Sequence, residues 1–184
     1  STSSTRRRAF LARHFPQHTA VEMRGNLQTR LEKLKNGDCD AMLLAFAGVH
    51  RMDMEAYIVE HLSLTTYVPA VGQGSVAIQC SSQLAPEHQE AIRQACNHEA
   101  TERCIVAERH LLAQLDGGCS VPVYGHAHLM DGQLHLQAGV LSLSGDQQIE
   151  SSFSGADPLI TGNQVAQALI NQGAQHLLKE IRLQ

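Results

Sequence analysis

The chain has 184 residues, of which 43% are hydrophobic and 17% are charged, and its formal net charge is −4. This composition is too apolar for an intrinsically disordered tail, and it is sufficient for the core of one large domain or two small ones. No apolar run approaches the length of a membrane span and no secretory signal opens the chain, so neither a membrane-spanning nor a secreted protein is indicated.

The positive charges are concentrated at the start of the chain. Residues 1–35 contain eight lysine and arginine residues and two glutamates, a net charge of +6, which leaves −10 for the remainder. A basic segment on an acidic protein indicates a localised anion-binding site. A nucleic-acid site would need aromatic groups for stacking, and only Phe10 and Phe15 stand among these arginines. Both phenylalanines are predicted to lie in the core instead.

The cysteines and histidines indicate neither a disulfide framework nor a metal site. There are five cysteines, an odd number without CxxC spacing, and their free thiols point to a reducing cytoplasm. They are Cys39, Cys80, Cys96, Cys104 and Cys119. His126 and His128 would share one face of a strand, which a surface strand explains better than a metal does. We therefore expect no bound metal.

Two helices are predicted in the basic segment from their capping residues. Ser3 or Ser4 can cap a helix that runs to about His14, because a short hydroxyl side chain accepts hydrogen bonds from the free N–H groups of the first turn. Asn26 is predicted to cap a second helix in the same way, and Gly37 is predicted to end it.

Apolar and β-branched runs predict strands between and after these helices. Thr19–Met23 alternates, and Asp40–Ala45 is a continuous apolar run of the kind found in buried parallel strands. A helix is predicted near Ala47–His61, with a break at Met52-Asp53. The resulting β-α-β order indicates an α/β layer. A further strand, residues 76–80, is predicted after a tight loop at residues 72–74.

The second half changes in character. Pro86–Ala95 predicts one helix, and Asn97 is predicted to cap another that runs to Leu115. Three β-rich runs follow, separated by turn sequences at Asp131-Gly132 and Ser144-Gly145-Asp146: Val121–Leu129, Gln133–Leu143 and Gln147–Phe153. A final amphipathic helix is predicted over residues 162–181. This half therefore indicates a small α+β unit in which helices cover a three-stranded antiparallel sheet.

One cysteine stands in a special setting. Gly117-Gly118 precedes Cys119, and Ser120-Val121-Pro122 follows it, at the end of the long predicted helix. Glycine tolerates backbone conformations that other residues avoid, so a bulky group could approach this sulfur closely. The setting favours a presented thiol that is reactive or modified, although a small residue that fills a turn is an alternative explanation.

Six motifs in order resemble porphobilinogen deaminase (hydroxymethylbilane synthase). They are Thr2-Ser3-Ser4-Thr5-Arg6-Arg7, Arg24-Gly25-Asn26-Leu27-Gln28-Thr29-Arg30-Leu31, Asp40-Ala41 with Ala47-Gly48-Val49-His50-Arg51, Pro69-Ala70-Val71-Gly72-Gln73-Gly74, Ala107-Glu108-Arg109, and Gly117-Gly118-Cys119-Ser120-Val121-Pro122. The resemblance covers nearly all of the chain. It implies a protein that corresponds to the C-terminal portion of the family and lacks most of its first domain.

The resemblance implies a domain plan. Residues 1–67 would form part of the second domain, an incomplete α/β domain that is similar to periplasmic binding proteins. Residues 68–96 would be a return segment that belongs to the family's first domain, together with a linker, and residues 97–184 would be the C-terminal α+β domain. The family enzyme is monomeric. Since the segment near residues 76–80 would have lost its sheet partners, we expect this chain to dimerise, swap or become disordered there.

The resemblance also implies a chemistry. The family is a cytoplasmic transferase of porphyrin, tetrapyrrole and haem biosynthesis, which condenses four porphobilinogen molecules into hydroxymethylbilane with release of ammonia. Its dipyrromethane primer is bound covalently through a cysteine thioether, here Cys119. The expected cofactor-binding residues are Cys119, Thr2, Ser3, Ser4, Arg6, Arg7, Arg24, Arg30, Arg51, Gln73 and Gly74. Arginine forks bind carboxylates, which porphobilinogen and the polypyrrole intermediates carry.

No catalytic residue is expected in this chain, because the family's catalytic aspartate belongs to the first domain. The chain alone is therefore expected to be inactive, and the primer to be absent if the chain cannot build it. The remaining alternative is a non-catalytic α/β module that binds an anion or another ligand. The other basic and cysteine residues have simpler explanations. Arg8 and Arg13 are predicted to be solvated, and Arg103 and Arg109 to pair with acids such as Glu99 or Glu108.

Overall fold

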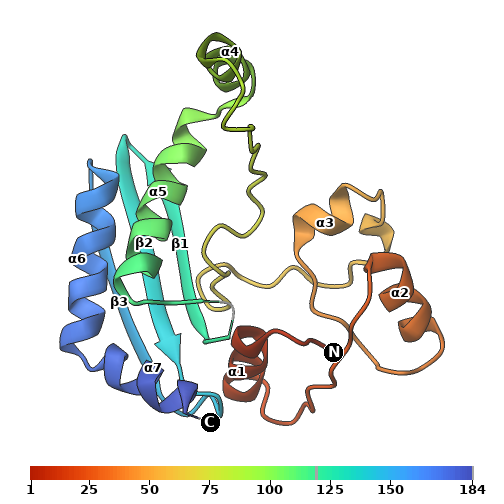
Figure 1. Ribbon diagram of the computed structural model, residues 1–184. Coiled ribbons are helices and arrows are strands. Elements are labelled where there is room, and N and C mark those ends of the chain that lie inside the picture. Colours follow the sequence, from red (N-terminus) through yellow and green to blue (C-terminus); the bar gives the residue numbers. More distant parts are fainter. Residues whose placement is uncertain (119, 184) are drawn as a thin grey trace.

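The computed structural model describes residues 1–118 and 120–183. It has two lobes, with α1 between them at their base (Figure 1). The described elements are α1 (Thr5–His14), α2 (Leu27–Lys35), α3 (Phe46–His50), the 3-10 helix η1 (Glu55–Tyr57), α4 (Pro86–Cys96), α5 (Glu99–Gln114), β1 (Val123–Met130), β2 (Gln133–Leu141), β3 (Gln148–Gly155), α6 (Pro158–Asn171) and α7 (Ala174–Arg182). None of the described helices has the length and apolar character needed to cross a membrane.

The C-terminal lobe is a three-stranded antiparallel sheet with helices on one face. The strand order is β1-β2-β3, and the register pairs Ala127 with Leu136 and Val140 with Ile149. Alternate residues of β2, such as Leu134 and Leu136, point into a core that α5 and α6 cover, as Figure 1 shows. The predicted α+β unit with its three strands is confirmed.

Local sequence determines the two hairpins. Asp131 and Gly132 both have positive φ angles, 51° and 76°, as the two central residues of a tight hairpin turn require. In the second hairpin Gly145 has φ 77°, and the side chain of Asp146 accepts hydrogen bonds from the hydroxyl groups of Ser142 and Ser144, each at 2.5 Å. Both predicted turns are therefore confirmed.

Two helix predictions in this lobe need correction. The cap of α5 is His98, whose ring accepts from the N–H of Thr101, whereas Asn97 ends α4 and donates its side-chain amide to Glu102 at 2.8 Å. The predicted helix over residues 162–181 is two helices, α6 and α7. They are separated by Gly173, whose φ of 95° is incompatible with a continuous helix.

The helices of the N-terminal lobe begin as predicted. Ser4 caps α1 by accepting from the N–H of Arg7, and Asn26 caps α2 by accepting from the N–H of Thr29 at 2.9 Å. Gly37 follows the end of α2 with φ 82°. Leu31 is the buried residue of α2.

The strands predicted at residues 19–23, 40–45 and 76–80 are wrong for this chain, since all three segments lack strand structure. Isolated bonds replace ladders. The N–H of Thr2 donates to the carbonyl of Val21 at 2.9 Å, while Ser1 donates its terminal amine to the carbonyl of Ala41 and accepts from the N–H of Leu43 at 3.2 Å. Apolar patterning can predict that a segment is extended, but a strand also needs a row of partner groups. The helix expected over residues 47–61 is reduced to α3 and η1, with Asp53 at φ 53° in the predicted break.

A small aromatic core joins α1 to the sheet. The Phe10 ring is fully buried between the rings of Tyr67 and Tyr124, with centroid distances of 4.9 and 5.0 Å. This confirms that Phe10 is a core residue. Arg13 is exposed, as predicted, and its guanidinium Nη1 also donates to the carbonyl of Gly145 at 3.0 Å, so the second hairpin is fastened to the end of α1.

This junction gives a stability prediction. In Gly145→Ala the new Cβ would lie 2.5 Å from the carbonyl oxygen of Ala9, and the residue would keep a positive φ. The free energy of unfolding should fall by about 2–4 kcal/mol, the sum of the left-handed penalty and the overlap. Chemical denaturation measures this change. Gly132→Ala is the matched control, because Gly132 has φ 76° with no heavy atom within 4 Å of the new Cβ, and should cost only about 1 kcal/mol. Equal losses in the two variants would contradict the close approach of the hairpin to α1.

Candidate functional site

The first turn of α1 carries two adjacent arginines that line a cavity formed by residues of the N-terminal part of the chain. Ser3 Oγ donates to the carbonyl of Met23 at 2.6 Å, and the Thr2 hydroxyl accepts from the N–H of Ser4 at 3.2 Å. These contacts hold the strand-like entry to the helix, and the Ser4 cap sets the first turn. Arg6 and Arg7 follow immediately.

Arg6 is a buried cation with incomplete hydrogen bonding. Its side chain is 6% exposed, its Nη1 donates to the carbonyl of Val68 at 2.6 Å, and its Nε has no partner among the described residues. Burial, with a further contribution from the neighbouring charge of Arg7, lowers the pKa of Arg6 to about 10. The group therefore remains a cation at neutral pH, with an unused N–H donor and a charge that an anion would stabilise.

Arg7 is partly buried beside it. Its Nη1 donates to the carbonyl of Leu43 at 2.8 Å, and its Nη2 lies 3.5 Å from Oε1 of Gln73. Burial lowers the pKa of Arg7, and the charge of Arg30 contributes in the same direction. The described residues include no ion-pair partner for Arg6 or Arg7.

Tyr67 is a part of this site that sequence reasoning missed. Its hydroxyl donates to the main-chain carbonyl of Arg7 at 2.7 Å, and burial raises its pKa to about 12, so it remains a neutral donor. Its sequence position after Thr65-Thr66 carries no motif, and only its place against Phe10 in the fold reveals the role.

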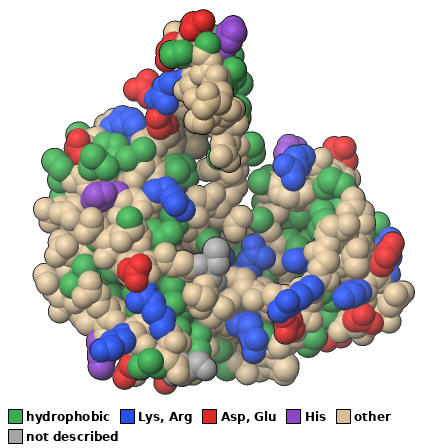
Figure 2. Space-filling view, in the orientation of Figure 1, with side chains coloured by type: hydrophobic (Ala, Val, Ile, Leu, Met, Phe, Trp, Pro, Cys, Tyr) green, Lys and Arg blue, Asp and Glu red, His purple; other side chains and the backbone are tan. Residues whose placement is uncertain are grey.

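The two arginines form one wall of a cavity of about 610 Å³. Gln73 lines the same wall, and most of the other lining residues are apolar, from α2, α3 and the segments that follow them. They include Leu27, Leu31, Leu34, Met42, Leu43, Leu44, Phe46, Val49, Ile58 and Leu62. Figure 2 shows Lys and Arg side chains gathered around the hollow between the lobes, beside this apolar surface. A largely apolar cavity of this size with cationic groups on one wall suits a small ligand that combines apolar surface with acidic groups.

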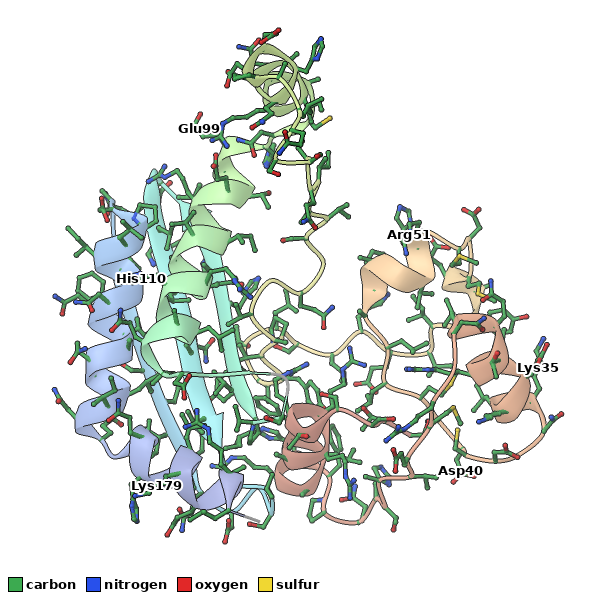
Figure 3. The ribbon with its side chains drawn as sticks, in the orientation of Figure 1. Lys35, Asp40, Arg51, Glu99, His110 and Lys179 are labelled. Carbon is green, nitrogen blue, oxygen red and sulfur yellow. The ribbon has the colours of Figure 1, made fainter. Side chains whose placement is uncertain are left out.

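The other predicted arginines are not all brought into the cavity. Arg24 is exposed and pairs with Glu22 at 2.8 Å, and Arg30 Nε donates to the carbonyl of Gly25 at 2.8 Å. Arg51 is exposed at the C-terminal end of α3, on the side of its lobe away from α1 (Figure 3). None of the three lines the cavity. The structure therefore brings together Arg6, Arg7 and Gln73, with Arg30 close enough to affect Arg7.

The loop that carries Gln73 is held from the C-terminal lobe. Gly72 and Gly74 have φ angles of 73° and 89°, and these positive values explain why glycine occupies both positions. The N–H of Gly72 donates to Oε2 of Glu108 at 2.7 Å. Sequence reasoning expected Glu108 to pair with arginine, and this is wrong, because both of its carboxylate oxygens accept main-chain N–H groups. Arg103 instead donates to the carbonyl of Ala156 at 2.8 Å.

The predicted thiol, Cys119, lies outside the described residues. Before it, Gly117 packs closely against α5, since a Cβ there would meet Cδ1 of Leu112 at 2.4 Å. The described cysteines at positions 39, 80, 96 and 104 are free thiols. Over residues 1–118 and 120–183, no group of three or more His, Cys, Asp or Glu side chains is arranged to hold a metal ion. His126 and His128 stack on one face of β1, with centroids 5.9 Å apart.

Comparison with known proteins identifies two family regions in this chain. A model described as "Porphobilinogen deaminase, dipyromethane cofactor binding domain" matches residues 1–89. One described as "Porphobilinogen deaminase, C-terminal domain" matches residues 102–171. The first contains α1 and the arginine wall, and the second contains most of α5, the whole sheet and all of α6.

Curated relatives agree with these regions. A protein named porphobilinogen deaminase from Desulfosudis oleivorans is 45% identical over 185 residues, which cover 100% of this chain and 60% of the relative. The protein of the same name from Cytophaga hutchinsonii is 46% identical, with 98% and 59% covered. That from Geobacillus kaustophilus is 40% identical, with 98% and 58% covered. The chain thus spans about three fifths of the length of these relatives.

Proposed function

Because this chain belongs to the porphobilinogen deaminase family, we propose that it supplies the carboxylate-binding wall and the primer-bearing unit of an enzyme of tetrapyrrole biosynthesis. The activity is hydroxymethylbilane synthesis, in which four porphobilinogen molecules are joined with release of ammonia. The observation that carries the proposal is the buried Arg6 beside the partly buried Arg7 on the wall of a largely apolar cavity.

The residues present fit a dipyrromethane primer. The group, when bound, supplies the end of the chain to which each further pyrrole is added. Its carboxylates would be held by Arg6 and Arg7, whose N–H groups are directed by fixed bonds to the Val68 and Leu43 carbonyls. The unpartnered Nε of Arg6 is the donor that a carboxylate would satisfy. Cys119 would hold the primer as a thioether.

Protein groups around this wall orient the ligand and restrict water. The Gln73 side chain places its amide oxygen 3.5 Å from Nη2 of Arg7, the bond to the Leu43 carbonyl directs that guanidinium, and Tyr67 keeps the first turn of α1 in place. The apolar residues of α2 and α3 that line the cavity would cover the rings of the primer, and they lower the local dielectric, which would strengthen the arginine–carboxylate attraction. We further propose that residues 1–67 belong to an α/β domain of the periplasmic-binding-protein type.

The whole-enzyme proposal is tested in a chimera. The 184 residues replace the matched 185 residues of the Desulfosudis oleivorans relative, and porphobilinogen consumption is measured. We expect turnover by the chimera and none by the 184-residue chain alone, because the family's catalytic aspartate belongs to the first domain. Enzyme-like turnover by the chain alone would contradict the second expectation. A chimera that folds and binds tricarboxylates but has no turnover would favour a non-catalytic binding module.

In that chimera, Arg7→Lys should raise the dissociation constant for porphobilinogen-derived carboxylates roughly 10- to 100-fold. Lysine keeps the charge but loses the planar fork that bonds Leu43 and a carboxylate together. Lys35→Gln is the control, because Lys35 is exposed at the end of α2 and lies over the Tyr57 ring, at 5.3 Å, away from the wall. Binding measured by calorimetry should be unchanged in the control. If both variants lose affinity equally, the arginine wall is not the carboxylate site.

We also propose that the 184-residue chain self-associates through residues 76–80. Val76 and Ile78 are 82% and 58% exposed on this extended segment. Light scattering should show a concentration-dependent dimer, and Val76→Asp should shift it to monomer. Val59→Asp, at a 97% exposed site on the other lobe, should leave the dimer intact. A monomeric wild-type chain at high micromolar concentration would contradict the proposal.

A further inference from the structure

Residues 67–73 are the segment through which the arginine wall contacts the C-terminal lobe. On one side, Arg6 Nη1 donates to the carbonyl of Val68, and Oε1 of Gln73 lies 3.5 Å from Nη2 of Arg7. On the other side, the N–H of Gly125 in β1 donates to the carbonyl of Pro69 at 3.1 Å. Displacement of this segment would therefore move the partners of both arginines.

Glu108 fastens the same segment to the sheet. It lies on α5 and is only 4% exposed. Its Oε2 accepts from the N–H of Gly72 and its Oε1 accepts from the N–H of Ala127 in β1, both at 2.7 Å. One carboxylate thus joins α5, β1 and the loop that carries Gln73. Short bonds from main-chain N–H groups to a carboxylate are among the stronger hydrogen bonds in proteins.

The free-energy cost of burying the Glu108 carboxylate indicates that this residue does more than fill space. An ionised carboxylate that is buried without a cation is expensive, and no ion pair to Glu108 is formed within the described residues. Burial raises its pKa, and the two N–H bonds oppose that rise. A glutamine or an apolar residue would fill the space without burying a charge. Only an acceptor with two oxygens can satisfy both N–H groups at once.

We propose that Glu108 is a positioning residue, which fixes residues 69–73 between the C-terminal sheet and the wall formed by Arg6 and Arg7. It touches neither arginine and acts through Gly72 and Gln73. The value of this role for ligand binding rests on the proposed function, whereas the positioning itself does not. Pro69, Val71 and Gly125 support it, since Cγ2 of Val71 would lie 3.3 Å from a Cβ at Gly125, so the loop packs directly on β1.

The test is Glu108→Gln in the 184-residue chain, with Glu102→Gln as the matched control. Glu102 lies on the same helix but pairs with Arg93 on the surface, at 2.6 Å. Glutamine keeps one acceptor oxygen and adds an N–H₂ group, so one of the two main-chain donors loses its partner. Hydrogen exchange of the Gly72 and Ala127 amides, and the NMR signals of the Arg7 Nε–H and the Gln73 side-chain amide, are followed together with the affinity for propane-1,2,3-tricarboxylate.

In Glu108→Gln, hydrogen exchange at the Gly72 or Ala127 amide should accelerate at least tenfold. The NMR signals of the Arg7 and Gln73 side chains should shift, and the affinity for the tricarboxylate should fall about three- to tenfold. Exchange at Leu136 in the centre of the sheet should not change, and the control should leave all signals in place. Unchanged exchange, or faster exchange without a shift at Arg7 and Gln73, would overturn the positioning role. If the signals shift but neither the wild-type chain nor the variant binds the tricarboxylate, the proposed function fails and the positioning role stands.

Discussion

Cys119→Ser is expected to abolish covalent attachment of the primer and to lower the turnover of the chimera by on the order of 1000-fold or more. A serine hydroxyl is a far weaker nucleophile than a thiolate at neutral pH, so it cannot form the corresponding bond at a useful rate. Intact-mass measurement detects the attached group directly, and porphobilinogen consumption reports turnover. The two readouts should be lost together.

Cys96→Ser is the control for this experiment. Cys96 is an exposed free thiol at the end of α4, remote from the arginine wall, and its replacement should leave mass and turnover unchanged. An adduct that persists in Cys119→Ser, or that disappears in Cys96→Ser, would assign the attachment to another residue. Cys104 is a poorer control because it is partly buried against the core of the C-terminal lobe.

Features that depend on neighbouring residues in sequence could be predicted from the sequence. Ser4 and Asn26 cap their helices, and Asp131-Gly132 forms its hairpin, because each of these signals acts within four residues. The strands expected at residues 40–45 and 76–80 depend on distant partners, and the apolar pattern says nothing about where those partners are. Residues 40–45 pair with Ser1, which donates its terminal amine to the carbonyl of Ala41 and accepts from the N–H of Leu43, and these two bonds do not make a strand ladder.

The residues of the site divide in the same way, into those that a sequence motif marks and those whose role depends on distant partners. Arg6, Arg7 and Gln73 belong to motifs and could be predicted to act together, although 66 residues separate Arg7 from Gln73. Tyr67 and Glu108 could not be assigned their roles, because their partners are main-chain groups, which every residue offers and no motif marks. Arg24 and Arg51 match motifs but lie apart from the cavity, so motif membership alone did not decide position.

Arg6→Met is expected to weaken tricarboxylate binding at least tenfold while changing the free energy of unfolding by no more than about 1 kcal/mol. Arg6 has a buried charge without an ion-pair partner in the described chain, and burial lowers its pKa to about 10, so its cationic form is held at a cost. Methionine fills a similar volume without that cost. The gain from removing the charge is offset by two losses. The variant loses the bond to the Val68 carbonyl and the contact with the Phe10 ring, which lies 5.7 Å from the guanidinium carbon.

In Arg6→Met the gain in stability from removing a buried charge nearly cancels the loss of two contacts. The variant therefore distinguishes a residue that is kept for binding from one that is kept for the fold. Arg8→Met, on the exposed face of the same helix, should leave both affinity and stability unchanged. Calorimetry gives the affinity and chemical denaturation gives the stability, both without added primer. A fall of more than about 2 kcal/mol in stability with unchanged affinity would show that Arg6 serves the fold. A large loss of affinity at unchanged stability would mean that the buried charge is kept for the carboxylate, because a protein that needed only a stable core would not retain it.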